Sequence, residues 1–169
     1  MIKLKKIEEY DLQLLRSWRN DDRIMKWCRQ NDLLSSTDQV RWYEKINIDP
    51  TIKMYLITTL IKGCTNCIGV CGLTSIDLIN SRAEFSLYIA PEYQNKGYGK
   101  TTLITLLNKG FNDFNLNLIW GETFNKNPAY KMFKSLGFKK EGTRRQFYYK
   151  NGKYVDAHLV SILRKEWRG

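Results

Sequence analysis

Two polar turn signals, each set between apolar runs, constrain the fold of this chain more than any other feature. They are Gly63-Cys64-Thr65-Asn66 and Lys150-Asn151-Gly152-Lys153. The runs beside them are rich in β-branched and aromatic residues and span Met54–Leu60, Ile68–Ile76, Phe138–Tyr149 and Tyr154–Leu163. Such runs predict β-hairpins, and Asn-Gly is typical of the tightest hairpin turns. The chain is therefore expected to contain two antiparallel strand pairs.

The rest of the chain alternates strand and helix patterns. Further strands are expected over Ile2–Ile7, Ser81–Ile89 and Leu116–Phe124. Apolar spacing and capping residues predict five helices, over Tyr10–Trp18, from the Asp21-Asp22 cap to Trp27, after the cap at Ser35–Asp38, over Thr101–Phe114 and over Pro128–Leu136. This order predicts an α+β fold with a single mixed, mostly antiparallel central sheet and helices on both faces. A doubly wound dinucleotide fold needs more parallel βα units than this chain offers.

Length and apolar content indicate one domain over residues 1–169. A chain of this size buries roughly 70% of its unfolded surface, and 43% hydrophobic residues argue against disorder. No apolar run approaches the ~18 residues of a membrane span, and Met1–Lys6 lacks the apolar stretch of a signal peptide. We therefore expect a cytoplasmic protein that does not enter a membrane.

Positive charge is concentrated in the C-terminal half. The whole chain has a net charge of +11; residues 1–90 hold 13 basic and 11 acidic side chains, whereas residues 91–169 hold 15 and 6. A basic arm for nucleic acid is usually a contiguous block, but here the bases are scattered through periodic sequence. This distribution favours a pocket or patch for an anion on a folded surface and does not suggest DNA binding.

The cysteines carry little information. Cys64 and Cys67 have the spacing of half a zinc knuckle, but no second pair exists and the one histidine, His158, is distant in sequence. We expect no metal site, a hairpin turn at Cys64–Cys67, and Cys71 buried as a small apolar residue.

A glycine-containing loop, Gln94-Asn95-Lys96-Gly97-Tyr98-Gly99-Lys100, follows an expected strand and opens an expected helix. The free N–H groups of a helix start and the helix dipole favour a phosphate there, and glycine lets the phosphate approach the backbone. The loop matches neither the P-loop nor the Gly-x-Gly-x-x-Gly fingerprint. It predicts a diphosphate site, with a simple helix cap as the alternative.

Three segments in order resemble the GNAT superfamily of acetyltransferases over nearly the full length of the chain. They are Arg82-Ala83-Glu84-Phe85-Ser86-Leu87-Tyr88-Ile89, Pro91-Glu92-Tyr93-Gln94-Asn95-Lys96-Gly97-Tyr98-Gly99 and Leu136-Gly137-Phe138. The tail, with Glu141-Gly142-Thr143-Arg144, Gly152, Asp156 and Glu166-Trp167, is similar to the branch of ribosomal-protein N-terminal, polyamine and amino-sugar-nucleotide acetyltransferases. The resemblance implies the GNAT fold, with residues 1–80 mainly on the acceptor side and 81–169 mainly on the acetyl-CoA side.

The resemblance also implies how acetyl-CoA binds. Strand residues Ser86–Ile89 are expected to splay from Trp120–Phe124 and admit the pantetheine arm, while backbone N–H groups of the glycine loop hold the pyrophosphate. The implied cofactor-binding residues are Leu87, Ile89, Gln94, Asn95, Lys96, Gly97, Tyr98, Gly99, Lys100, Asn127 and Phe133. The anionic cofactor gives the positive C-terminal half a specific partner.

Direct attack of an amine on the thioester requires a group that accepts a proton, since an alkylammonium has a pKa near ~10. The family pattern assigns this role to Glu84, with a structural ion pair as the alternative and Glu122 as second candidate. Many members protonate the leaving thiolate with a tyrosine, but the matching position here is Phe133. Tyr130, about one turn earlier, is the substitute candidate, with simple packing as its alternative.

The acceptor is expected to contact Trp18 and Arg19, within Leu15–Asn20, a segment similar to that of amino-sugar-nucleotide acetyltransferases. The alternative places Trp18 in the core and Arg19 against a carboxylate. N-terminal arginines favour an amino-sugar nucleotide as acceptor. A ribosomal-protein N-terminus is the next possibility, and a polyamine requires an acidic pocket from residues such as Glu84, Glu44 and Asp49.

A different class of function is a non-enzymatic RNA- or ribosome-binding module. A monomer or a homodimer is expected.

Overall fold

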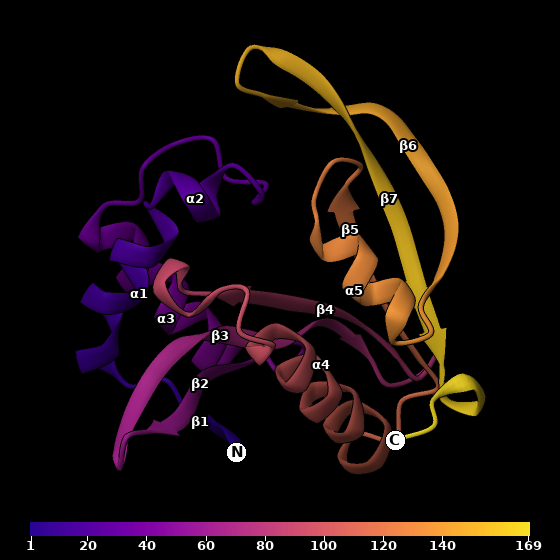
Figure 1. Cartoon of the computed structure of the whole chain (residues 1–169), viewed down its shortest axis with the longest axis horizontal. Helices are drawn as coiled ribbons and strands as arrows, with labels where there is room; N and C mark the ends of the chain where they lie inside the picture. Colours follow the sequence, from indigo (N-terminus) through magenta and orange to yellow (C-terminus); the bar gives the residue numbers. More distant parts are fainter.

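The computed structural model describes residues 1–169, and its seven strands form one sheet in the order β1-β2-β3-β4-β5-β7-β6 (Figure 1). The strands are β1 (Ile2–Lys5), β2 (Lys53–Ile61), β3 (Cys64–Asp77), β4 (Arg82–Ile89), β5 (Leu118–Phe124), β6 (Lys139–Lys150) and β7 (Lys153–Leu163). The α-helices are α1 (Leu12–Arg19), α2 (Asp22–Met25), α3 (Ser36–Ile48), α4 (Tyr98–Asn108) and α5 (Ala129–Ser135). All predicted elements are present, with ends that differ by a few residues.

Every neighbouring pair of strands is antiparallel except β4 and β5, which run parallel. This arrangement confirms the predicted α+β fold with a mixed, mostly antiparallel sheet. The parallel ladder joins only Arg82, Ala83 and Glu84 to residues 118–120. Beyond Glu84 the two strands part, while β4 stays paired with β3 as far as Ile89.

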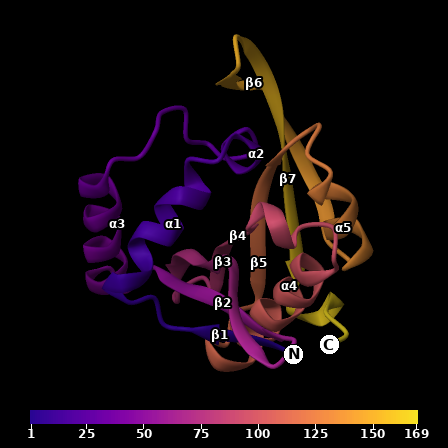
Figure 2. The same cartoon turned by 60° about the vertical axis from the view of Figure 1, so that its left-hand side comes forward.

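Helices cover both faces of the sheet, because successive side chains of its central strands point to opposite sides. Leu56 and Val70 pack with α1 and α2, whereas Ile57 and Cys71 belong to the larger core under α4 and α5. Figure 2 shows α1 and α3 on one side of the sheet and α4 and α5 on the other. No helix is both long and apolar enough to cross a membrane.

Both predicted hairpins form, but the first turn is tighter than the sequence suggests. Its corner is Lys62-Gly63, with φ of 50° and 81°, and strand β3 begins at once with Cys64. The prediction that Cys64–Cys67 forms the turn is therefore wrong. Cys64 and Cys67 are three residues apart on one strand, which directs their side chains to opposite faces. The second turn is Asn151-Gly152, as predicted.

Phe85 fills the region where β4 and β5 begin to part. Its ring packs edge-on against Phe133 of α5 and Phe138, with centroids 5.1 and 5.2 Å away. The ring lies over the backbone of Gly121 on β5, where an added Cβ would fall 2.3 Å from Phe85 Cε1. The absence of a side chain at Gly121 therefore lets an aromatic ring sit between the diverging strands.

We expect Gly121→Ala to destabilise the protein by about 1–3 kcal/mol, because the ring cannot move away from its aromatic neighbours. Gly142→Ala on β6 is the matched control, since its Cβ would meet nothing within 4 Å. Urea unfolding of both variants measures the difference. Equal stabilities for the two variants would contradict this account of the gap.

Candidate active site

The parting of β4 from β5 leaves one edge of β4 without a strand partner. On the other edge, the Ala90 N–H donates to the Ile68 carbonyl at 2.9 Å. Because backbone groups of successive residues point to opposite edges, those of Leu87 and Ile89 face the gap. The Ile89 carbonyl already accepts from Gln94 Nε2 at 2.9 Å. The Leu87 N–H and C=O and the Ile89 N–H are therefore available to a bound chain of amides.

The glycine loop places free N–H groups beside this edge. Asn95 and Gly97 both adopt the left-handed conformation, with φ of 59° and 80°. Helix α4 begins directly afterwards, and the Thr101 N–H makes the first helical bond, to the Gly97 carbonyl. The N–H groups of the first turn of α4 have no helical partner. A Cβ at Gly97 would meet nothing within 4 Å, so the surface above it is open.

A cavity of about 430 Å³ joins the β4 edge, the loop and the start of α5. Nine of the eleven predicted cofactor residues line it, namely Leu87, Ile89, Gln94, Asn95, Gly97, Gly99, Lys100, Asn127 and Phe133. Lys96 and Tyr98 do not. Lys96 Nζ instead donates to the Glu92 carbonyl at 2.8 Å, and Tyr98 packs on Tyr93. The cavity fits a long ligand with a phosphate end.

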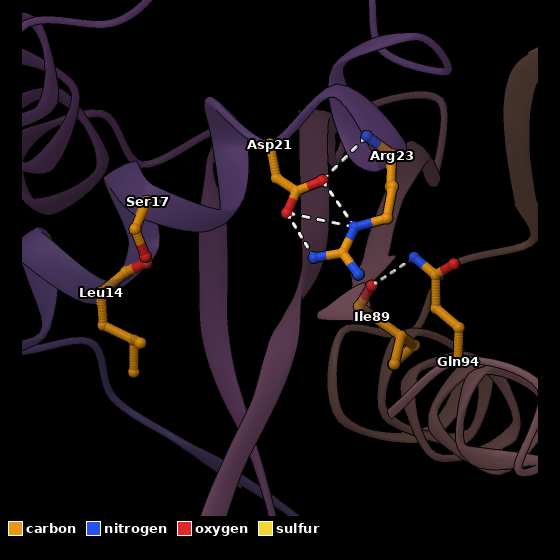
Figure 3. A network of polar contacts seen from close by, with 6 residues as sticks. All are labelled: Leu14, Ser17, Asp21, Arg23, Ile89 and Gln94. Atoms are coloured by element: carbon orange, nitrogen blue, oxygen red, sulfur yellow. Dashed lines mark hydrogen bonds and ion pairs between the residues drawn. The ribbon is translucent and has the colours of Figure 1, made fainter. Parts of the chain in front are cut away.

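Arg23 lines the same cavity and was not predicted as a cofactor residue. Its backbone N–H and its guanidinium donate to Asp21, the N-cap of α2, with the shortest contact 2.6 Å from Nη2 to Oδ2. These hydrogen bonds lower the pKa of the Asp21 carboxyl to about 2. Figure 3 shows Arg23 beside the Gln94–Ile89 hydrogen bond. Asp21 therefore holds the Arg23 guanidinium in place at this end of the cavity.

A central cavity of about 310 Å³ continues from the first between the diverging strands. The two share Trp27, Cys28, Leu87, Asn127, Ala129 and Phe133. A third cavity of about 510 Å³, lined partly by α3, shares Arg19, Arg29, Thr74, Glu84 and Ser86 with the central one. The three form a path from the glycine loop to α3 and pass between Glu84 and Glu122.

Glu122 of β5 is the most buried carboxylate on this path, with a side chain that is 3% exposed. Its Oε2 accepts from the Tyr148 hydroxyl at 3.0 Å and lies 3.5 Å from both Arg29 and Arg144. Its Oε1 is buried and has no hydrogen-bond partner. A buried carboxylate oxygen without a donor is costly, so this atom points to a ligand that donates a proton.

Glu84 lies across the gap from Glu122 and is paired at Oε1 with Arg29. Its side chain is 12% exposed, so it is also largely buried. The alternative predicted for Glu84, a structural ion pair with Arg82 or another basic neighbour, is therefore present, with Arg29 as the partner, while Arg82 pairs with Asp77. Arg29 therefore bridges the two carboxylates that the sequence suggested as proton acceptors.

Tyr130 does not lie in the cleft, so the prediction that it protonates the leaving thiolate is wrong. Its ring packs on His158 with centroids 5.0 Å apart, and it lines none of the three cavities. Ala129 and Phe133, four residues apart on α5, present the face that lines the cleft. The phenol that reaches the central cavity is Tyr148 of β6, whose pKa is raised by burial.

Trp18 is 5% exposed in the core with Leu15 and Ile24, which contradicts its predicted contact with an acceptor and confirms the alternative for this residue. Arg19 does line the central and third cavities. It holds no carboxylate: its Nε and Nη2 donate to Gln30 Oε1 at 3.1 and 2.9 Å. Arg19 therefore lies beside the acceptor path, and its contact with an acceptor stays a prediction.

A sheet that opens between two parallel strands, beside a helix-opening glycine loop, is the arrangement expected of an enzyme that transfers an acyl group from coenzyme A. Residues 2–139 match the family model described as the Acetyltransferase (GNAT) domain, and the chain belongs to this family. It is an N-acetyltransferase that uses acetyl-CoA as acetyl donor.

Known relatives cover nearly the whole chain. It is 27% identical to the uncharacterized N-acetyltransferase p20 of Bacillus licheniformis, over 98% of this chain and 94% of that one. It is 28% identical to the spermidine N(1)-acetyltransferase of Vibrio cholerae, over 97% and 94%. The crystal structure of the Vibrio cholerae spermidine N-acetyltransferase in complex with CoA and spermine superposes with a TM-score of 0.91, at 28% identity, over 98% and 96% of the two chains.

We expect Gly97→Ala to weaken acetyl-CoA binding by about tenfold or more. The added Cβ would occupy the open surface where the phosphate is expected, and alanine is strained in the left-handed conformation of this residue. Gly63→Ala in the β2–β3 turn is the matched control, with φ of +81° and no atom within 4 Å of its Cβ. Isothermal titration calorimetry measures the affinity. An equal loss of affinity in both variants would show that backbone strain alone is responsible.

Proposed function

We propose that this N-acetyltransferase acetylates the primary amine of an aliphatic polyamine-type substrate, and that the reacting ammonium binds to Glu122. The observation that carries this proposal is Glu122 Oε1, a buried carboxylate oxygen without a partner on the path between the cavities. An ammonium supplies the hydrogen bonds that this atom lacks and offsets its buried charge.

The charges along the path support an amine substrate. The cofactor cavity is lined by the cations Arg23 and Lys100 and by no carboxylate. The central and third cavities together contain four carboxylates and three cations, namely Asp38, Asp49, Glu84, Glu122, Arg19, Arg29 and Lys45. The positive charge of the chain is thus not concentrated at the acceptor end.

Two of the three residues expected to form an acidic polyamine pocket, Glu84 and Asp49, line these cavities; Glu44 does not, and Asp38 adds a further carboxylate. The phosphates of an amino-sugar nucleotide would lie close to these groups, which disfavours that acceptor. The similarity to spermidine acetyltransferases points the same way. Membership of an enzyme family also replaces the alternative of an RNA-binding module.

The proposed reaction begins with loss of a proton from the ammonium to Glu122 Oε1, while the other oxygen stays bound to Tyr148. Acetyl-CoA supplies the thioester that the neutral amine attacks directly. Glu84 lies on the opposite strand, where its carboxylate is paired with Arg29. A thiol has an ordinary pKa of about 8.5, so it leaves readily as a thiolate and a tyrosine on α5 is not essential.

Cytoplasmic location and a monomeric or homodimeric state stay predictions.

A thiol-release assay with acetyl-CoA and a panel of amines tests the acceptor class. We expect turnover with spermidine or an alkyl diamine, and little with a UDP-amino sugar or a peptide N-terminus. Preferred turnover of the nucleotide or the peptide would overturn the proposed acceptor.

We expect Glu122→Gln to lower kcat/KM for the accepted amine by about 10²–10⁴-fold, because an amide keeps the shape but cannot accept the proton. Acetyl-CoA affinity should stay within about twofold, since Glu122 does not line the cofactor cavity. Glu44→Gln, an exposed position on α3, is the control for charge loss. Nearly wild-type kcat/KM in Glu122→Gln would exclude Glu122 as the proton acceptor.

A further inference from the structure

Arg29 occupies an unusual place for a side chain of the acceptor path. It lies in the segment between α2 and α3, pairs with Glu84 and approaches Glu122 to 3.5 Å. Its side chain is still 50% exposed, and it lines both the central and the third cavity. A positive charge of the protein itself therefore sits where the carboxylates of an amine site converge.

The position of Arg29 leaves the buried oxygen Glu122 Oε1 free. Arg29 engages Glu84 Oε1 and faces Glu122 Oε2, whereas Glu122 Oε1 has no partner. One ammonium therefore finds a free oxygen, but a second positive charge close to it would be next to the guanidinium. The next carboxylates, Asp38 and Asp49, line the third cavity, which continues the path past Arg29.

The segment that carries Arg29 is held by the C-terminal hairpin. Lys150, the last residue of β6, is 8% exposed, and its Nζ donates to the carbonyls of Met25 at 3.3 Å and of Gln30. These two carbonyls flank Arg29 in sequence. Burial lowers the pKa of Lys150. Figure 1 shows the tip of the β6–β7 hairpin reaching toward α2.

We propose that Arg29 determines the charge spacing of the acceptor, and that Lys150 is the positioning residue that holds Arg29 in place. Arg29 disfavours a second ammonium close to the reacting amine and permits one farther along, near Asp38 and Asp49. This inference rests on the proposed alkylamine acceptor. It concerns how closely spaced the charges of that acceptor can be.

The test compares two amines with the same three-carbon chain, propylamine and 1,3-diaminopropane. Their kcat/KM values and their calorimetric affinities in the presence of CoA are measured. We expect Arg29→Met to raise the ratio of kcat/KM for the diamine to kcat/KM for the monoamine by about tenfold over wild type. The reason is that the substitution removes a positive charge that repels the second ammonium from a few ångströms away. Comparing ratios cancels the different pKa values of the two amines. Arg41→Met, an exposed position on α3 outside the cavities, is the control and should leave the ratio unchanged.

Lys150→Met should shift the ratio in the same direction as Arg29→Met, and Lys150→Arg should restore the wild-type ratio by keeping a cationic donor. Lys153→Met on the same hairpin controls for loss of charge, and melting temperatures show whether each variant folds. An unchanged ratio in Arg29→Met, while wild type turns over both amines, would overturn the inference and leave the proposed function standing. If wild type acetylates neither amine nor spermidine, the proposed function itself fails and this inference with it.

Discussion

The early end of the β4–β5 ladder is the constraint on which the rest of this structure depends. Three residue pairs hold the parallel strands together, and beyond Glu84 the two strands separate while their outer partners remain paired. Phe85 packs across the point of separation over Gly121. This gap exposes a backbone edge for the amides of the cofactor and places Glu84 and Glu122 opposite each other. In a continuous sheet, the backbone groups on that edge of β4 would pair with β5, and no cleft would form between the two carboxylates.

Charge follows the same geometry. The phosphate end of the path carries Arg23, Lys100 and the free N–H groups of α4. The acceptor end combines carboxylates and cations, with Arg29 between two of the carboxylates. The net charge of +11 describes the chain as a whole, and the local arrangement decides which ligand fits where. The two ends of one path therefore differ in charge, and the proposed amine acceptor belongs to the end that carries the carboxylates.

Local signals predicted most of the fold and the cofactor loop, because those features depend on residues adjacent in sequence. Asn151-Gly152 predicts the second hairpin, and the Gln94–Lys100 loop predicts a helix opening, although α4 begins at Tyr98, three residues before the predicted Thr101. The acceptor end depends on residues brought together from distant elements. Arg29 of the α2–α3 segment and Tyr148 of β6 meet Glu122 only in the folded chain. No short-range pattern in the sequence indicates these contacts.

Two aromatic residues also show that a local sequence pattern does not predict which way a side chain faces in the folded chain. Trp18 has a polar neighbour on each side in sequence, yet it is buried, because its position on α1 faces the sheet. The family pattern places the thiolate donor at Phe133, and Tyr130 is the predicted substitute about one turn earlier. On a helix, however, the spacing between two residues decides the direction in which each side chain points. One step from Ala129 around α5 is enough to place its ring on His158 instead of in the cleft.

The central claim is that the strand gap brings the thiol end of the donor and the acceptor nitrogen together at Glu122. A crystal structure of the complex with CoA and spermidine tests it most directly. The account predicts pantetheine along the open edge of β4 and a primary nitrogen within hydrogen-bond distance of Glu122 Oε1. A primary nitrogen bound elsewhere, with Glu122 Oε1 still without a partner, would contradict it.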